Sequence, residues 1–221
     1  MDAQPSFRPH DLLWAVDASA FASEEALPDW SSGEWVRIAP VVIRREKVAD
    51  AGYLPVGLRG ATREQRHKTY LRRDRVERWA TPEMLSRAAA LLRARCLARF
   101  AAIDTLIDIA PLLDAMHLAW GPTGGVGFTL ASGIVVLHPG SDLDLVVRAP
   151  EVLDADTVKA LCDIERHASC RLDIQIDTGH GAFSIAEWAR GKQRVLLKTD
   201  AGPVLTHAPW SEIESTAGGL A

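Results

Sequence analysis

Two aspartates in an apolar, strand-like run are the feature that most limits what this chain can fold into. The run reads Ser-Asp-Leu-Asp-Leu-Val-Val over 141–147. Side chains at i and i+2 of a strand share one face about 7 Å apart, so Asp142 and Asp144 point together, while Leu143 and the next leucine enter a core. Neighbouring carboxylates raise each other's pKa and resist losing water. A divalent cation relieves both costs, so the pattern predicts a metal site that substrate phosphates and water complete.

A second acidic run is expected on a neighbouring strand. Residues 171–177 read Arg-Leu-Asp-Ile-Gln-Ile-Asp, with Asp173 and Asp177 on one face of the predicted strand. Either of these two carboxylates is a candidate to complete the metal site, and the sequence leaves the choice open. The competing interpretation is an exposed polar face of an edge strand.

A glycine pair precedes the acidic strand. Gly124 and Gly125 lie in the sequence Trp-Gly-Pro-Thr-Gly-Gly-Val-Gly. Glycine lets backbone N–H groups approach a phosphate closely, although an ordinary glycine turn is the simpler alternative. No Gly-Lys-Ser/Thr follows at the spacing of a P-loop. We therefore predict that the glycine pair cradles phosphates, with the Ser141 hydroxyl as an additional contact.

Composition excludes several classes of protein. The 221 residues are 48% apolar and 24% charged, as in a soluble globular protein, and the net charge of −4 argues against a nucleic-acid binder. The three cysteines have no metal-ligand spacing, which is typical of reduced cytosolic thiols. The N-terminus lacks the features of a secretion signal, and no apolar run is long enough to span a membrane. We therefore expect a cytoplasmic protein without a membrane or nucleic-acid partner.

The order of predicted elements divides the chain near residue 80 and indicates an α+β protein. A small β-rich N-terminal domain is expected over 1–80, and a larger domain with a mixed sheet flanked by helices over 81–221. The predicted strands are 35–47, 52–58, 127–131, 133–138, 142–148, 171–178, 194–199 and 202–206. The predicted helices are 82–100, 103–118 (interrupted at Pro111), 154–167 and 184–190.

A basic segment stands out in this acidic chain. Residues 59–78 contain eight Lys or Arg and three acids. One interpretation is a solvated helical face with i,i+3 or i,i+4 ion pairs. The other is a surface that grips phosphates or an acidic protein, and on it we predict that Arg59 and Arg66 bind substrate.

The histidines give a weaker signal. There is no His-x-x-x-His metal pair. His138 and His180 flank the acidic strands, where a turn or a hydrogen-bonded partner is the favoured interpretation. His10, beside Asp11, is expected to be a feature of an N-terminal turn.

The glycine pair, the Gly-Ser-Asp-x-Asp run and the later strand acid together resemble the nucleotidyltransferase superfamily that includes polymerase-β-like enzymes. The resemblance implies a polymerase-β-like catalytic domain in which Asp142, Asp144 and Asp173 bind two metal ions. The glycine and serine loop would hold a triphosphate. The spacing from the glycine pair to the aspartates is longer than is common in that superfamily, and an inserted hairpin over 128–138 would account for it.

Five blocks of sequence occur in order between residues 8 and 210: Arg-Pro-His-Asp-Leu-Leu-Trp from residue 8, Leu-Pro-Val-Gly-Leu-Arg-Gly from 54, Trp-Gly-Pro-Thr-Gly-Gly-Val-Gly-Phe from 120, Ser-Asp-Leu-Asp-Leu from 141 and Gly-Ala-Phe-Ser-Ile-Ala-Glu-Trp from 181. With these blocks the chain resembles, over nearly its whole length, the phosphoribosyl-dephospho-CoA transferases, which are the holo-acyl-carrier-protein synthases of bacterial malonate decarboxylase.

The resemblance implies a reaction. The enzyme would transfer the phosphoribosyl-dephospho-CoA group from 2′-(5″-triphosphoribosyl)-3′-dephospho-CoA to a serine of an apo-acyl carrier protein and release pyrophosphate. Mg²⁺ or Mn²⁺ would be bound by Asp142, Asp144 and Asp173, and the phosphates by Gly124 and Gly125. At Gly125 the family more often has serine, so one hydroxyl contact is lost.

Two other functions remain open at this point. One is a nucleotidyltransferase that acts on a small molecule or on the hydroxyl of another protein. The other is a non-catalytic nucleotide-binding regulatory domain, against which the retention of both strand aspartates argues.

Overall fold

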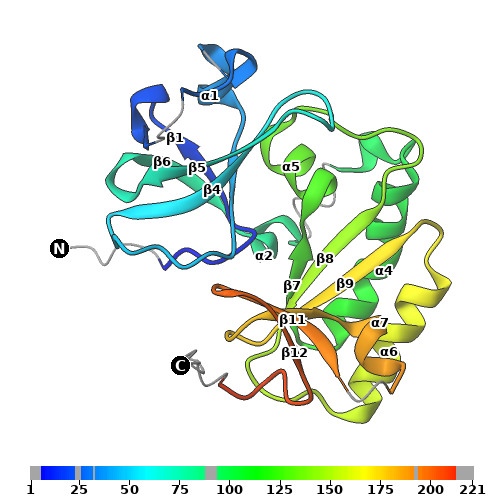
Figure 1. Ribbon diagram of the computed structural model, residues 1–221. Coiled ribbons are helices and arrows are strands. Elements are labelled where there is room, and N and C mark those ends of the chain that lie inside the picture. The colour runs from blue at the N-terminus through cyan, green and yellow to red at the C-terminus, as the bar shows by residue number, and fades with distance from the viewer. Residues whose placement is uncertain (1–5, 23–25, 32, 88–93, 192–193, 213–221) are drawn as a thin grey trace, which may run out of the picture.

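Two six-stranded sheets organise the computed structural model, which describes residues 6–22, 26–31, 33–87, 94–191 and 194–212 (Figure 1). Sheet A is antiparallel and has the order β2-β5-β4-β3-β1-β6. Sheet B has the order β12-β11-β10-β9-β8-β7, and only its β8–β9 pair is parallel among the described strands. The strands of sheet A are β1 (Leu12–Ala15), β2 (Phe21–Ala22), β3 (Val41–Ile43), β4 (Tyr53–Arg59), β5 (Arg66–Arg72) and β6 (Val76–Ala80). Those of sheet B are β7 (Ala119–Pro122), β8 (Leu143–Arg148), β9 (Leu172–Asp177), β10 (Ala182–Ser184), β11 (Val195–Thr199) and β12 (Gly202–Thr206).

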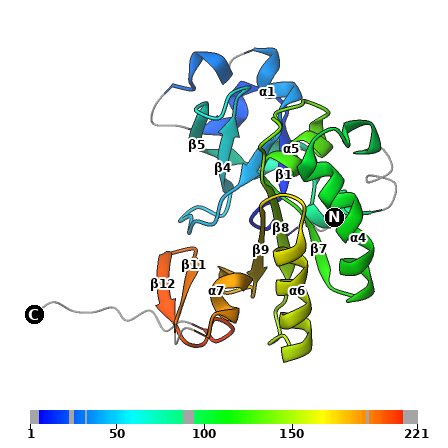
Figure 2. The same ribbon diagram turned by 90° about the vertical axis from the view of Figure 1, so that its right-hand side faces the viewer.

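Helices cover one face of sheet B. The α-helices are α1 (Glu34–Ile38), α2 (Pro82–Leu85), α4 (Ala101–Ala115), α5 (Gly124–Ser132), α6 (Ala155–His167) and α7 (Ile185–Ala189). Single 3₁₀ turns lie at Ala18–Ala20, Asp29–Ser31, Arg73–Arg75 and Arg95–Leu97. In Figure 2, α4 and α6 lie on the same side of β8 and β9. Apolar residues of both helices pack there against Leu143, Leu145 and Ile174, which are fully buried.

This packing decides which way the strand acids point. Because side chains alternate along a strand, burying Leu143 and Leu145 under the helices turns Asp144 to the opposite face of sheet B. The predicted burial of the leucines is therefore confirmed, and the free face of the sheet is left for polar side chains.

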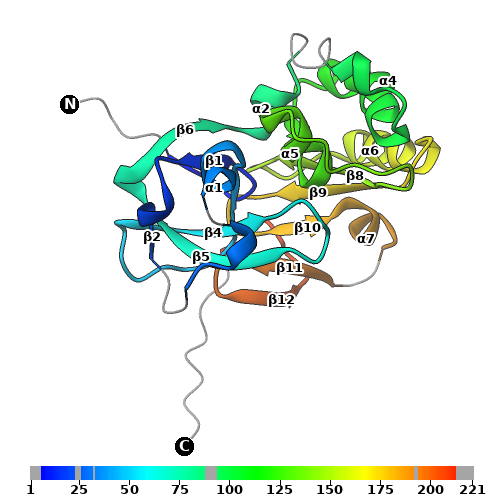
Figure 3. The same ribbon diagram turned by 90° about the horizontal axis from the view of Figure 1, so that it is seen from above.

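Sheet A has its own core and a second face that meets the rest of the molecule. One face buries Leu13, Val56 and Leu71. On the other face, Leu12 and Trp14 of β1 pack against α2 and against the C-terminal half of α5. Seen from above, sheet A lies over the strands of sheet B, beside α2 and α5 (Figure 3). Helix α5 thus packs against both sheets.

The predicted α+β class is confirmed, as are most elements after residue 142. The strand at 142–148, the helix at 154–167, the strand at 171–178 and the elements that follow match β8, α6, β9, α7, β11 and β12 within one or two residues. The helix start at Thr81 is also confirmed, because its hydroxyl accepts a hydrogen bond from the Met84 N–H at 3.3 Å. No helix among the described residues is long and apolar enough to cross a bilayer.

The predicted hairpin after the glycine pair is wrong. Residues 124–132 form helix α5, and the described loop that follows contains no strand before β8. Ser132 and Gly133, which lie between the two predicted strands, are the helix C-terminus, where Gly133 adopts a left-handed conformation with φ of 75°. Valine, phenylalanine and threonine favour strands, but burial of Val126 in the core of sheet B and of Phe128 beneath Arg59 of sheet A overrides that preference.

Four other predictions need correction. The run 35–47 contains helix α1 and only a three-residue strand, β3. The basic segment 59–78 is β5, a 3₁₀ turn and β6 rather than a helical face. Helix α2 ends at Leu85, so 82–100 is not one helix; residues 88–93 lie outside the described part. Helix α4 continues through Pro111, which is exposed and removes only one N–H from the helix.

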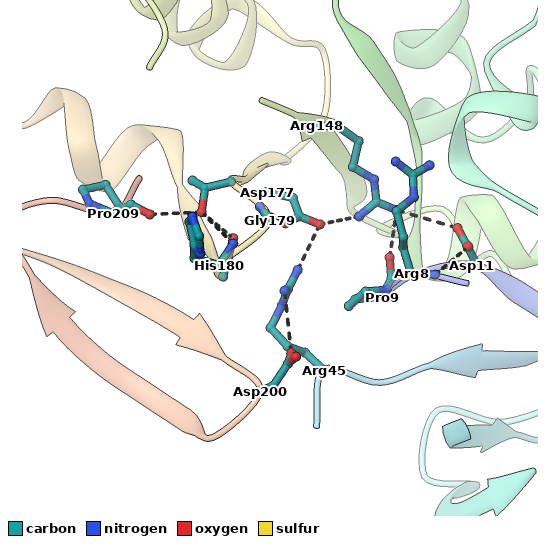
Figure 4. Close-up of polar contacts among 12 residues, drawn as sticks. Arg8, Pro9, Asp11, Arg45, Arg148, Asp177, Gly179, His180, Asp200 and Pro209 are labelled. Atoms are coloured by element: carbon teal, nitrogen blue, oxygen red, sulfur yellow. Dashed lines mark hydrogen bonds and ion pairs between the residues drawn. The ribbon is translucent and has the colours of Figure 1, made fainter. Parts of the chain in front are cut away.

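A buried cluster of ion pairs joins the two sheets (Figure 4). Arg148 at the end of β8 contacts the Asp177 carboxylate at the end of β9, and its side chain is only 6% exposed. Its Nε lies 3.2 Å from Glu83 Oε1 of α2, and its Nη2 donates to the Pro9 carbonyl at 2.8 Å. Asp11 Oδ1, just before β1, lies 3.7 Å from the same Nη2. One guanidinium therefore holds β9, α2 and the entry to sheet A.

Arg45, which follows β3, adds a second cation. Its Nη2 lies 3.0 Å from Asp177 Oδ2, and its Nη1 lies 3.9 Å from Asp200 in the β11–β12 turn. Burial alone would raise the pKa of Asp177, but Arg45, the Gly179 N–H and Arg148 together lower it. Asp177 is therefore ionised and shared by one arginine from each sheet.

We expect Arg148→Ala to lower the free energy of unfolding by about 3–5 kcal/mol. The substitution removes the buried guanidinium but leaves the carboxylates of Asp177 and Asp11 buried. The matched control is Arg166→Ala on α6, whose pair with Asp163 is exposed and whose loss should cost less than about 1 kcal/mol. Urea denaturation measures both values. Equal small losses in the two variants would contradict the role given to Arg148.

Candidate active site

The parallel pair β8–β9 brings two of the predicted acids together. Asp144 and Asp173 are register partners, so their side chains leave the sheet on the same face. Asp142 lies just before β8, where its Oδ2 is 3.7 Å from Arg171 Nη1. Gln175 donates to Asp173 at 3.1 Å. The acids thus form a group at the start of the two strands, on the face that α4 and α6 leave free.

The three carboxylates of this group repel one another when they are ionised. Burial raises the pKa of Asp144, and Asp173 and Asp142 raise it further, while Arg171 and Arg59 oppose them. A half-buried carboxylate with two like charges beside it is held at an electrostatic cost. Such a cost is what a bound cation removes.

The structure separates Asp177 from this group. Its register partner is Arg148, four residues beyond Asp144 along the strand, and both belong to the ion-pair cluster described above. Asp173 is therefore the acid that lies beside Asp144.

The glycine pair forms the start of helix α5. Gly124 has φ of 57°, and a Cβ atom there would lie 2.1 Å from Asp144 Oδ2. The Thr123 N–H donates to the Asp144 carbonyl at 2.8 Å, which fixes the turn against β8. Thr123 makes no side-chain cap to the helix. The first N–H groups of this helix therefore remain open to an anion beside the acids.

Two arginines of sheet A point to the same helix end. Arg59 and Arg66 are register partners at the ends of β4 and β5. Arg59 lies over the Phe128 ring, 5.5 Å from its centroid, and a Cβ at Gly125 would be 3.6 Å from Arg59 Nη1. Burial lowers the pKa of Arg59 to about 10, and Arg66 lowers it as well, while Asp144 opposes them. The Arg59 Nε is buried without a hydrogen-bond partner in the described structure.

A pocket lies between sheet A and α5. Twelve residues line it: His10, Leu12, Pro40, Val42, Gly57, Arg59, Arg66, Pro122, Thr123, Gly124, Gly127 and Phe128. Its lining includes two guanidinium groups, one of which has a buried Nε without a hydrogen-bond partner in the described structure, and the uncapped N-terminus of α5. This combination is suited to a multiply charged anion such as a chain of phosphates.

Two other predicted residues, Ser141 and Gly125, are not among the residues that line the pocket. Ser141 does not line the pocket; its hydroxyl accepts from the His138 N–H at 2.9 Å and closes the turn before β8. Gly125 lies beneath the Arg59 guanidinium, one residue into α5. His138 and Ser141 therefore fix the turn that directly precedes Asp142.

His10 is a pocket residue that the sequence did not reveal. It has φ of 75°, a conformation that is rare for residues other than glycine. Its N–H donates to the Ile43 carbonyl at 3.1 Å. Burial lowers the pKa of His10 to about 4, and Arg148 and Arg45 lower it too. The imidazole is therefore neutral near pH 7. The sequence indicated only that His10 lies in a turn, and nothing in it predicted a role in a pocket.

The acids suit a divalent cation that shares its coordination with a substrate. Among the residues described, no three acidic, histidine or cysteine side chains lie close enough to hold an ion by themselves. Mg²⁺ in proteins is commonly bound by one or two carboxylates, with phosphates and water completing the shell. Asp144 and Asp173, beside an anion-binding helix end, provide that kind of donor set.

Comparison with known proteins gives one consistent result. The family model for the C-terminal domain of phosphoribosyl-dephospho-CoA transferase MdcG matches residues 85–209, and the model for its N-terminal domain matches residues 8–82. A Pseudomonas putida (strain GB-1) protein named phosphoribosyl-dephospho-CoA transferase is 42% identical over 210 residues, covering 95% of this chain and 98% of the relative. A Klebsiella pneumoniae protein of the same name is 40% identical over 214 residues, covering 97% and 100%. No solved structure shows a significant match.

We expect Gly124→Ala to destabilise the protein more than Gly133→Ala does. Both residues have positive φ, so each substitution strains the backbone by about 1 kcal/mol. A Cβ at Gly133 meets no atom within 4 Å, whereas one at Gly124 collides with the Asp144 carboxylate. Chemical denaturation should show at least about 1 kcal/mol more loss for Gly124→Ala. Equal losses would mean that α5 does not begin against Asp144.

Proposed function

Because this chain belongs to the phosphoribosyl-dephospho-CoA transferase family and is therefore a transferase enzyme, we propose that it loads the acyl carrier protein of malonate decarboxylase. The donor is 2′-(5″-triphosphoribosyl)-3′-dephospho-CoA, the acceptor is a carrier serine, and the product released is pyrophosphate. A reducing cytoplasm is the proposed compartment. The observation that carries this proposal is the meeting of Asp144 and Asp173 with the open N-terminus of α5 and the arginine pair.

The proposed reaction is a displacement at the α-phosphorus of the donor's triphosphate. A bond forms between the serine oxygen and phosphorus, the bond to the β-phosphate oxygen breaks, and the serine proton is released. The chain's main tasks in such a reaction are positioning the groups and balancing their charge. We assign those tasks to residues of both sheets.

Residues of α5 and sheet A would hold the leaving group. The N–H groups at Gly124 and Gly125 and the cations Arg59 and Arg66 would lie beside the pyrophosphate, where negative charge gathers as it leaves. Fixed donors aimed at developing charge lower a barrier without having to reorganise. Arg59 already has a buried Nε that lacks a partner.

The acids would hold the cofactor. Asp144 and Asp173, with Asp142 at the entrance of β8, are the proposed ligands of Mg²⁺ or Mn²⁺. When bound at these carboxylates, such an ion would supply positive charge to the attacking and leaving oxygens. The raised pKa of Asp144 and its proximity to Asp173 support this assignment.

We expect the wild-type protein with Mg²⁺, donor and apo-carrier to increase the carrier mass by one phosphoribosyl-dephospho-CoA group. Asp144→Asn should reduce the rate at least about 100-fold because it removes a charged ligand, and EDTA should abolish transfer. Asp163→Asn on the exposed face of α6 is the matched control. Intact-mass spectrometry of the carrier is the measurement.

Two outcomes would argue against the proposal. Full activity of Asp144→Asn would remove the acids from the mechanism. A folded, donor-binding protein that leaves every carrier unmodified would favour a nucleotidyltransferase with another acceptor, which a screen of small-molecule hydroxyls would then identify.

The exposed face of β5 is the proposed docking surface for an acidic carrier. Arg66, Lys68 and Arg72 alternate along this strand and are exposed. Arg66 reaches the pocket, whereas Lys68 and Arg72 lie farther along the strand. Arg72 also pairs with the exposed Asp74 at 2.8 Å. Two further cations of the basic segment have partners away from this face: Arg75 pairs with Asp17, and Arg78 stacks on Trp14.

We expect Lys68→Glu combined with Arg72→Glu to raise the KM for the carrier about tenfold, because exposed charges steer protein association. The KM for the donor should not change. Arg166→Glu, an exposed cation on α6, is the control. Steady-state kinetics with each substrate varied gives the answer, and an unchanged carrier KM would exclude this docking surface.

A further inference from the structure

The apolar part of the pocket has no role in holding phosphates. Its floor is made by three neighbouring strands, because Leu12 of β1 pairs with Val42 of β3, and Val42 pairs with Gly57 of β4. Paired residues of adjacent strands share a face, so the floor is continuous. Phe128 of α5 lines the same pocket. The result is a slot between a sheet and a helix that opens toward Arg59.

Gly57 leaves the middle of this floor open. It is an interior residue of a seven-residue strand, a position where glycine weakens a sheet. A Cβ there would lie 3.4 Å from Val42 Cγ1, which is close to ordinary contact. Packing therefore does not demand glycine, and the bare backbone of β4 leaves room for a ligand to approach closely.

His10 provides a neutral polar group in the slot. No hydrogen bond involves its ring in the part of the chain that the structure describes, and the residue is partly exposed. Burial lowers the pKa of His10 to about 4, so the ring both donates and accepts hydrogen bonds at neutral pH. Among the described lining residues, the other neutral polar side chain is Thr123.

Resting on the proposed function, we infer that this slot binds the adenine ring of the donor, with His10 as its hydrogen-bonding partner and Gly57 as the open floor. Dephospho-CoA contains adenosine, and a planar heteroaromatic ring fits between a bare strand and an aromatic side chain. The other candidate occupant is the pantetheine arm. The amides of that arm need several neutral hydrogen-bonding partners along an extended groove. The slot offers two such side chains, His10 and Thr123.

Binding measurements without the carrier separate this inference from the transfer reaction. Isothermal titration calorimetry would use four probes: AMP, dephospho-CoA, 4′-phosphopantetheine and tripolyphosphate. The protein variants are Gly57→Val, which fills the slot, His10→Gly, which removes the ring and tolerates the positive φ, and His10→Asn, which keeps a hydrogen-bonding side chain and tolerates it too. His180→Asn, at an exposed histidine outside the pocket, is the control.

We expect wild-type protein to bind AMP and dephospho-CoA, with affinity at least about tenfold weaker in Gly57→Val and in His10→Gly. His10→Asn should lose less, His180→Asn should lose nothing, and tripolyphosphate should bind all variants equally. Thermal unfolding confirms that each variant is folded.

Three results would overturn the inference: no binding of AMP or dephospho-CoA by the wild type, unchanged affinity in Gly57→Val, or loss confined to 4′-phosphopantetheine. Each can occur while carrier loading by the wild type succeeds. A failed carrier assay together with the expected binding pattern would instead preserve the adenine slot and reject only the proposed acceptor.

Discussion

The Arg148 guanidinium is the contact on which the geometry of this protein depends. Buried ion pairs recover their desolvation cost only when several partners surround each charge. Arg148 meets this requirement through Asp177, Glu83 and the Pro9 carbonyl, which come from β9, α2 and the entry to sheet A. Arg45 binds the same Asp177 from the other sheet. Because these partners are far apart in sequence, the cluster fixes how sheet A lies over sheet B, and so places the arginines of β4 and β5 above the start of α5.

Opposite charges at the site are each held in an unfavourable state. Burial and neighbouring acids raise the pKa of Asp144, while burial and Arg66 lower that of Arg59. Asp144 and Arg59 each oppose the pKa shift of the other, but the pKa of Asp144 stays raised and that of Arg59 stays lowered. The Arg59 Nε also has no hydrogen-bond partner in the described structure. A ligand that carries both a cation and an anion would relieve both costs together. A metal–phosphate complex has this property, which is why we favour a phosphate-transfer role over a purely structural one.

The sequence was a good guide where the relevant forces are local. Alternation in β8 predicted that Leu143 and Leu145 enter the core and that Asp144 lies on the opposite face, because a strand has a fixed period of two. It failed at α5, where strand-favouring residues form a helix that both sheets bury, and at Pro111, where an exposed position tolerates the lost N–H. The choice between Asp173 and Asp177 needed the parallel register, which places Arg148 beside Asp177. His10 was missed because its surroundings come from β3, β4 and α5.

The pocket is a property of the junction between the sheets and not of either sheet alone. Sheet A contributes the floor of the slot and both arginines, whereas the stretch from β7 into α5 contributes the helix end and Phe128. The acids belong to β8 and β9 alone. If sheet A shifted, the acids would keep their register and Arg171 but would lose Arg59, the second cation that lowers the pKa of Asp144. The N-terminal sheet is therefore best understood as half of the donor site, and the buried ion pairs between the sheets as the means by which that half is kept in place.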